Sequence, residues 1–222
     1  MWIDEIKNHQ WSKYSQYGEE GYLRFIFKKI GVTNKFLVDL GANDGKYLSN
    51  TRIFLNEGWG GVLIEGRQFP GIHQHFITAE NINELLEKYG VPSEFDLLSI
   101  DLDGNDFWIL RNLLTKYRPR LIVSEYNSEF DDSRTIEYDP AFSFGATDYY
   151  GYTFGAGLKL AEEFGYRVIF QNANLNMYYL RKDLLENPEM EIDVPHPVAE
   201  WWRLNNGEYH GKVDDRKKWV MI

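Results

Sequence analysis

Short apolar runs alternate with longer amphipathic stretches along most of this chain. The apolar runs have four to seven residues, as buried parallel strands do, whereas the stretches between them repeat apolar residues at helical spacing. The last two runs are separated only by a tight turn, so we expect the final strand to lie antiparallel to its neighbour. The expected strands are residues 36–40, 61–66, a short one within 67–77, 97–100, 121–127, 166–171 and 175–181. The expected helices are residues 21–30, 50–56, 78–89, 107–117 and 154–164.

The first strand is followed by a glycine turn, Gly41 to Gly45, which leads into a helix that Ser49 or Thr51 can cap. A strand, a glycine turn and a helix start together offer bare backbone N–H groups to a ligand. The spacing is Asp-x-Gly-x-x-x-Gly, which is neither the dinucleotide fingerprint nor a phosphate loop. An ordinary tight turn is the alternative interpretation.

An acidic residue also ends the second expected strand. Glu65 lies about 20 residues beyond the first turn, where a carboxylate in a βαβ unit accepts the hydroxyls of a ribose. The alternative is an exposed glutamate at a strand end.

Carboxylates crowd the ends of the next two strands. Asp101, Asp103 and Asp106 follow one strand, and Glu125 and Asn127 end the next. Like charges held together favour a cation nearby, either a sulfonium, an ammonium or a divalent metal. Oxygen ligands of this kind suit Mg²⁺ or Ca²⁺, although they can equally orient a substrate, and a solvated acidic turn is the simpler alternative.

We expect one domain over residues 1–222, with two less regular ends. Residues 1–30 form a helical segment whose polar part is either a plain loop or a lid, and residues 186–222 form a tail packed on the body. In that tail, Trp201 and Trp202 are expected to pin the chain. Residues 128–153 have little periodicity and are a candidate substrate cover, because structureless segments of this length are usually functional.

Composition excludes several classes of function. The net charge of −10 and the lack of a basic run argue against binding to nucleic acid or to an anionic membrane. Without cysteine, the chain has no disulfide, thiol nucleophile or cysteine-bound metal. No apolar stretch has membrane-spanning length and the N-terminus lacks a signal-peptide core, so a cytoplasmic protein is the simplest expectation. The sequence leaves the oligomeric state open.

The order of strands and helices resembles class I S-adenosylmethionine-dependent methyltransferases, and several blocks resemble the FkbM-type family among them. The similarity runs from about Tyr14 to Leu184. At Gly157, members of this family more often have serine. The blocks are residues 15–21, 38–45, 63–65, 98–106, 124–127 and 155–158.

The resemblance implies an α/β, Rossmann-like, doubly wound fold with a mostly parallel seven-stranded sheet and an antiparallel last strand. It implies that S-adenosylmethionine is the cofactor, with its methionine end at Asp39 and Gly41 and its ribose at Glu65. Asp101 then lies near the transferred methyl group. We also assign Asn43 to cofactor binding and Asn81 to a contact with the adenine.

The implied reaction is O-methylation of a sugar or another small hydroxylated metabolite. Asp101 and Asp103 are the candidate catalytic carboxylates, acting as general base. Asp101, Glu125 and Asn127 are candidate ligands for Mg²⁺, because some sugar O-methyltransferases use a metal at comparable strand ends. A non-catalytic nucleoside-binding or scaffold protein is the alternative, and the glycine spacing disfavours an NAD-dependent oxidoreductase.

Overall fold

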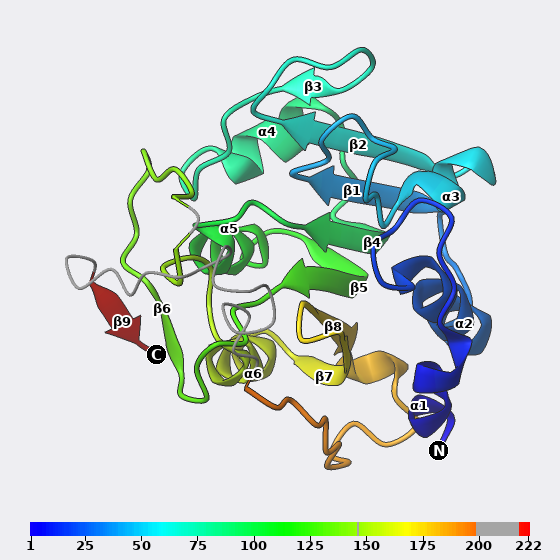
Figure 1. Cartoon of the computed structure of the whole chain (residues 1–222). Helices are drawn as coiled ribbons and strands as arrows, with labels where there is room; N and C mark the ends of the chain where they lie inside the picture. The colour runs from blue at the N-terminus through cyan, green and yellow to red at the C-terminus, as the bar shows by residue number, and fades with distance from the viewer. Residues whose placement is uncertain (146, 199–217) are drawn as a thin grey trace.

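A seven-stranded sheet forms the centre of the molecule in the computed structural model, which describes residues 1–145, 147–198 and 218–222 (Figure 1). All of its strands run parallel except β8, which is antiparallel to both neighbours. From one edge to the other, the strands are β3 (His73–Gln74), β2 (Gly60–Glu65), β1 (Phe36–Leu40), β4 (Glu94–Ile100), β5 (Arg118–Glu125), β8 (Asn176–Arg181) and β7 (Tyr166–Asn172). This arrangement confirms the expected doubly wound α/β fold with an antiparallel last strand.

Helices cover both faces of the sheet (Figure 1). Those from the first quarter of the chain pack on one face, and α4, α5 and α6 pack on the other. The helices are α1 (Trp2–Glu5), η1 (Ile6–His9), α2 (Glu19–Ile30), α3 (Arg52–Asn56), α4 (Ile82–Lys88), α5 (Asp106–Leu113), α6 (Phe154–Glu163) and η2 (Lys182–Leu184).

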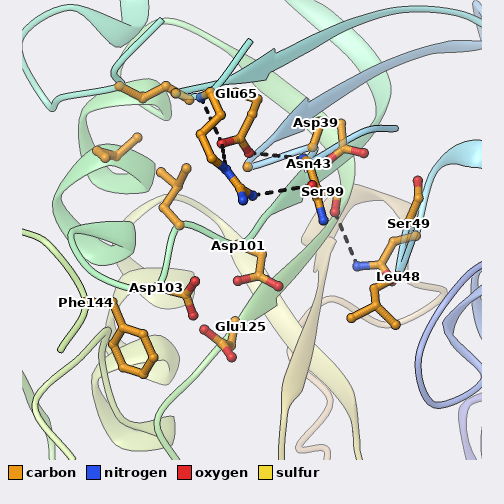
Figure 2. A pocket seen from close by; sticks show the side chains of 18 of the residues that line it. Asp39, Asn43, Leu48, Ser49, Glu65, Ser99, Asp101, Asp103, Glu125 and Phe144 are labelled. Atoms are coloured by element: carbon orange, nitrogen blue, oxygen red, sulfur yellow. Dashed lines mark hydrogen bonds and ion pairs between the residues drawn. The ribbon is translucent and has the colours of Figure 1, made fainter. Parts of the chain in front are cut away.

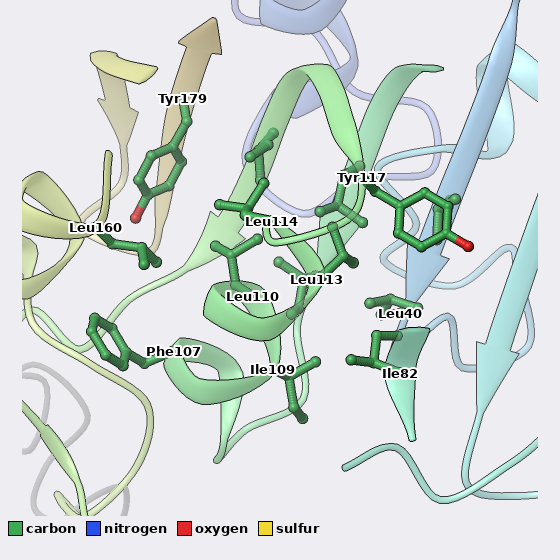
Figure 3. Close-up of a cluster of buried hydrophobic side chains, with 14 of the residues drawn as sticks. Leu40, Ile82, Phe107, Ile109, Leu110, Leu113, Leu114, Tyr117, Leu160 and Tyr179 are labelled. Carbon is green, nitrogen blue, oxygen red and sulfur yellow. The ribbon is translucent and has the colours of Figure 1, made fainter. Parts of the chain in front are cut away.

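Alternate residues of the strands feed two cores, one on each face. On β1, for example, Leu37 packs with the N-terminal helices, whereas Val38 and Leu40 pack with the other set. Figure 3 shows the second core, in which Leu110 and Leu113 of α5 lie between the sheet and the neighbouring helices. Continuous apolar strands are therefore explained by burial on both sides.

Several elements are shorter than the sequence pattern predicts. Helix α3 begins at Arg52, and the backbone N–H of Arg52 donates to Ser49 Oγ at 3.0 Å. Ser49 therefore caps the start of the helix and does not belong to it. Strand β3 has only two residues and pairs with the end of β2.

The order of the strands reverses between β1 and β4. The chain builds β1, β2 and β3 outward to one edge and then returns to place β4 and β5 on the other side of β1. Ligands of open parallel sheets bind beyond the strand ends at such a reversal.

A small second sheet lies beside the main body. Strand β6 (Arg134–Ile136) pairs antiparallel with β9 (Trp219–Met221), so the last residues of the chain hold part of the long 128–153 connection. Trp201 and Trp202, which were expected to hold the C-terminal tail on the body, lie outside the described residues.

Gly157 lies where α6 meets the underside of β8. A Cβ atom at this position would come within 2.5 Å of the Tyr179 hydroxyl and 2.8 Å of Met177. The same hydroxyl lies 2.7 Å from that of Tyr152, which donates to Ser124 Oγ at 2.8 Å. A buried chain of hydroxyls thus links β8, β5 and the residue two positions before α6, and its Tyr179 end occupies the space that a side chain at 157 would need.

None of the helices in the described ranges combines the length and the apolar character required to traverse a lipid bilayer.

Candidate active site

A cavity of about 1020 Å³ opens at the carboxyl ends of β1, β2, β4 and β5, at the reversal of strand order. Asp39, Glu65 and Asp101, which end three of these strands or follow them, all line it (Figure 2). The sequence-based expectation that these three strand ends meet at one hollow is therefore met. A cavity of this size is at the upper end of the range for small-molecule sites.

Asp39 lies at the inner wall of the cavity and is 4% exposed. Thr51 Oγ1 donates to its Oδ2 atom at 2.5 Å. The pKa of Asp39 is raised to about 6, chiefly by burial and also by the charge of Glu65, although hydrogen bonds from Thr51 and Ser99 act in the opposite direction. This carboxylate therefore gains from a positive group placed beside it.

Gly41 begins the turn that follows β1, and its conformation is set by the neighbouring strand. Its φ is +84°, and a Cβ atom would lie 1.8 Å from the carbonyl oxygen of Asp101. The backbone amide of Asp101 in turn donates to the carbonyl of Leu40 at 3.0 Å. Glycine is thus required here because two strand ends approach each other closely at the cavity floor.

Glu65 faces the glycine turn across the cavity rim. Its Oε2 atom accepts the backbone N–H of Asn43 at 3.1 Å, and its Oε1 atom accepts the backbone N–H and the Nε of Arg67 at 3.1 and 3.3 Å. The Arg67 side chain is 70% exposed and also donates to Asn43 Oδ1 at 3.3 Å (Figure 2). Glu65 is therefore already oriented by backbone N–H groups, and the exposed guanidinium of Arg67 lies beside it at the solvent edge.

Three carboxylates converge on the floor of the cavity beyond β4 and β5. One oxygen from each of Asp101, Asp103 and Glu125 lies within 4.8 Å of the other two, and Figure 2 shows their side chains pointing toward one another. Burial raises the pKa of Asp101 and of Glu125 well above the usual range, and the charge of Asp103 raises both further. The charge of Asp101 also raises the pKa of Glu125, whereas the hydrogen bond between the two lowers that of Asp101. We call these three residues the carboxylate cluster.

Asp106 does not belong to this cluster, contrary to the sequence-based expectation that it crowds the same strand end. It is the first residue of α5, is 1% exposed, and accepts the backbone N–H groups of Leu102 and Gly104, both at 2.8 Å. Acidic residues favour this position because unpaired N–H groups cluster there. Asp106 thus shapes the turn that carries Asp103.

Two amide residues assigned to the site are engaged elsewhere. Asn127 is fully buried, and its Nδ2 donates to the carbonyls of Asp148 and Tyr150 at 2.8 and 3.1 Å. Asn81 accepts the backbone N–H of Thr78 and donates to the carbonyl of Phe76, both at 2.9 Å. Neither lines the cavity, and each instead fixes a loop that does.

Segments that are distant in the sequence also form walls of the cavity, and the contribution of the β7–β8 turn was not predicted from the sequence. Gln16 and Tyr17 line the cavity from the N-terminal side, as the lid alternative requires, and Leu175 lines it from the β7–β8 turn. The expected substrate cover, residues 128–153, also reaches the cavity. It contributes Phe142, Ser143, Phe144 and Tyr150.

Phe142 lies against the turn that presents Asp103. A Cβ atom on Gly104 would come within 2.4 Å of its ring, so the glycine allows the aromatic side chain to pack directly on that turn. The high aromatic content of the irregular segment was the only sequence signal for this wall.

Comparison with known proteins agrees with this geometry. Residues 71–168 match the family model described as the methyltransferase FkbM domain, and no curated protein matches the chain significantly. The match includes the carboxylate cluster and the 128–153 connection, whereas the glycine turn and Glu65 precede it. Taken together, the sheet order, the acidic cavity at its reversal and the match over residues 71–168 support a methyltransferase similar to the FkbM type.

Proposed function

We propose that this methyltransferase uses S-adenosylmethionine and methylates a hydroxyl group of a sugar or of another small hydroxylated metabolite. The observation that carries the proposal is the shared cavity of Asp39, Glu65 and Asp101 at the strand reversal. Its volume of about 1020 Å³ leaves room for a nucleoside and a small acceptor together.

The residues present fit the cofactor. Glu65 would accept the ribose hydroxyls, and Asp39, with the backbone around Gly41 and Asn43, would hold the ammonium of the methionine end. The exposed ring of Phe76, which lines the cavity, would lie beside the adenine in place of Asn81. S-adenosylmethionine, when bound, supplies a methyl group on a sulfonium that is already a good leaving group.

The chain's own contribution is therefore positioning and proton transfer. Asp101 and Asp103 would orient the acceptor hydroxyl, and one carboxylate of the cluster would accept its proton. The raised pKa values of Asp101 and Glu125 suit this task, because a base is most effective when its pKa lies near the working pH.

The same cluster could hold Mg²⁺, since three carboxylate oxygens lie close together and hard cations prefer oxygen ligands. Asp101, Asp103 and Glu125 would be the ligands, and the ion would lower the pKa of an acceptor hydroxyl. Asn127 is not included, because its amide is used in the loop.

Calorimetric titration with S-adenosylhomocysteine tests the cofactor assignment. We expect binding by the wild-type chain and an affinity about 10- to 100-fold weaker for Glu65→Ala, because charge-assisted hydrogen bonds are lost. The exposed Glu186→Ala is the matched control and should bind normally. A wild-type chain that gives no heat at millimolar ligand would remove the proposal, and unchanged affinity in Glu65→Ala would reject the ribose role.

Titration with MgCl₂ tests the metal. Heat that is present for the wild type, absent for Glu125→Gln and retained in Glu186→Gln would support the ion. Methyl transfer that survives EDTA undiminished would reject it. Tight binding of S-adenosylhomocysteine without transfer to any hydroxylated acceptor would favour the non-catalytic alternative.

A further inference from the structure

Two adjacent glutamates at the start of α2 are completely buried and lie outside the cavity. Glu19 and Glu20 both have 0% exposure, and neither forms an ion pair with a residue in the described ranges. A buried carboxylate is costly unless hydrogen bonds compensate it. The hydrogen-bond donors to Glu19 and Glu20 therefore show which parts of the chain these two carboxylates hold in place.

Glu20 is bound by the segment that precedes the helix, residues 11–18, which we call the N-terminal segment. Its Oε2 atom accepts the backbone N–H groups of Lys13, of Tyr14 at 2.9 Å and of Ser15 at 3.3 Å, and also the hydroxyl of Ser15 at 3.3 Å. Consecutive amides pointing at one oxygen bend the chain around the carboxylate.

Glu19 connects this segment to a part of the chain more than 150 residues away. Its Oε2 atom accepts the backbone N–H of Tyr17 at 2.7 Å. Its Oε1 atom accepts the side-chain amides of Asn172 and Asn176 at 2.9 and 3.1 Å, with sequence separations of 153 and 157 residues. The hydroxyl of Tyr178 donates to Asn172 Oδ1 at 2.9 Å and so fixes the orientation of that amide.

Both segments that Glu19 joins form walls of the cavity. Tyr17 and its neighbour Gln16 line it, and so does Leu175, which lies between the two asparagines. The carbonyl of Leu175 accepts the backbone N–H of Tyr126 at 2.9 Å, directly after Glu125 of the carboxylate cluster. The joined wall thus lies next to the strand end that carries Glu125.

Glycines keep the N-terminal segment close to the helix. A Cβ atom on Gly21 would lie 2.0 Å from the carbonyl oxygen of His9, and one on Gly18 would lie 2.4 Å from the Gln10 side chain. These contacts fix the start of the segment against the helix, and the buried carboxylates hold the residues that follow, from Lys13 to Tyr17.

We propose that Glu19 is a positioning residue that holds Tyr17 and Leu175 together as one wall of the cofactor cavity, while Glu20 shapes the segment that carries Tyr17. The inference rests on the proposed function for its ligand, because it assigns the wall to the site that would bind S-adenosylmethionine. The hydrogen bonds by which Glu19 joins the N-terminal segment to the β7–β8 turn do not depend on the identity of the ligand.

The test compares Glu19→Gln with Tyr166→Phe. The glutamine keeps the size of the side chain, but its single carbonyl oxygen cannot serve both Tyr17 and the two asparagines. Tyr166→Phe removes a buried hydrogen bond of 2.7 Å to the carbonyl of Pro119, far from the cavity, and controls for general loss of stability. Trypsin cleavage after the exposed Lys13, mapped by mass spectrometry, reports on the segment, and titration with S-adenosylhomocysteine reports on the cavity.

In Glu19→Gln we expect cleavage after Lys13 to accelerate about tenfold and the dissociation constant to rise about tenfold, the effect of one charge-assisted hydrogen bond. Tyr166→Phe should leave both unchanged. Equal changes in the two variants would show that Glu19 only stabilises the fold and would overturn the proposal, as would faster cleavage with unaltered affinity.

A wild-type chain that does not bind S-adenosylhomocysteine would refute the proposed function, while the cleavage rates would still decide whether Glu19 links the segments. If Glu19→Gln does not fold, hydrogen exchange of the wild-type chain gives the answer. The amides of Lys13, Tyr14, Ser15 and Tyr17 should exchange slowly and be slowed further by the ligand. Fast exchange of these amides, or no further slowing by the ligand, would overturn the proposal.

Discussion

Single residues at the strand ends carry the geometry of the site, and the glycine turn is the clearest case. Gly41 and Gly58 have the same φ of +84°, but only Gly41 faces another part of the backbone. The two positions therefore separate the cost of a left-handed conformation from the cost of a steric conflict at the cavity floor.

Replacing each glycine by alanine should give different losses of unfolding free energy. Gly58→Ala, with no atom within 4 Å of the new Cβ, should lose about 1 kcal/mol, because only the backbone conformation is unfavourable. Gly41→Ala should lose about 3 kcal/mol or more, because β1 and β4 must separate. Urea unfolding measures both, and equal losses would mean that the strand ends adapt without strain.

At the scale of elements, the long connection between β5 and α6 is held by the end of the chain. Trp219 of β9 packs its ring 4.9 Å from that of Tyr149 and 5.1 Å from that of Phe130, and the Tyr149 hydroxyl donates to the carbonyl of Lys218 at 2.6 Å. The same connection contributes Phe142 and Phe144 to the lining of the cavity. A three-residue strand thereby supports a wall of the site.

Trp219→Ala should loosen this wall without disturbing the opposite end of the cavity. We expect chymotrypsin to cleave near Phe142 and Phe144 about tenfold faster, because an aromatic contact of roughly 1 kcal/mol or more is lost. Affinity for S-adenosylhomocysteine should change less than about threefold, since Glu65, the proposed partner of the ribose, belongs to β2 and not to this connection. Trp2→Ala, which removes a ring packed on Phe25, is the control, and cleavage that rises equally in both variants would contradict the expectation.

At the scale of the whole molecule, the sheet was predictable because its order depends on local apolar runs and short connections. The strand ends were predictable for the same reason, so Asp39, Glu65 and Asp101 meet as expected. Tyr17 and Leu175 were not predictable as neighbours, because buried Glu19 joins them across most of the chain.

The roles of similar side chains at one strand end were also beyond the sequence. Asp103 and Asp106 are three residues apart, yet one faces the cavity and the other accepts the amides of its own turn. Asn127 likewise follows the strand end as expected, but the fold of the 128–153 connection takes up its amide. The role of each side chain depends on which backbone N–H and C=O groups nearby need a hydrogen-bond partner, and the pattern of residue types does not indicate those groups.

The acidic cavity should make the ligand-free molecule less stable as the pH rises. Asp39 has a pKa raised from 3.8 to about 6, so the native state binds more protons than the unfolded state between these values, and stability falls as the pH increases through them. Between pH 5 and pH 8, this one group should cost about 1–2 kcal/mol. The raised pKa values of Asp101 and Glu125 act in the same direction.

Unfolding by urea at pH 5 and pH 8 measures this loss, and Asp39→Asn isolates the share of Asp39. The variant should lose less stability between the two pH values, whereas the exposed Asp193→Asn should follow the wild type. The lowered pKa of His75 acts in the opposite direction but is common to all three proteins. Parallel pH profiles for Asp39→Asn and wild type would refute the assignment.

The close approach of α6 to β8 couples two positions that are 22 residues apart, Gly157 and Tyr179. A serine at 157 would need the volume that the tyrosine hydroxyl and the end of the Met177 side chain occupy. The flexible methionine can move aside, whereas the hydroxyl is held by its hydrogen bond to Tyr152, so the serine and the tyrosine compete for one small space. Gly157→Ser should therefore be tolerated only together with Tyr179→Phe. Natural sequences with serine at 157 should therefore lack a hydroxyl at 179. They should then also lack the buried hydrogen bonds that connect position 179 through Tyr152 to Ser124, on the strand of Glu125.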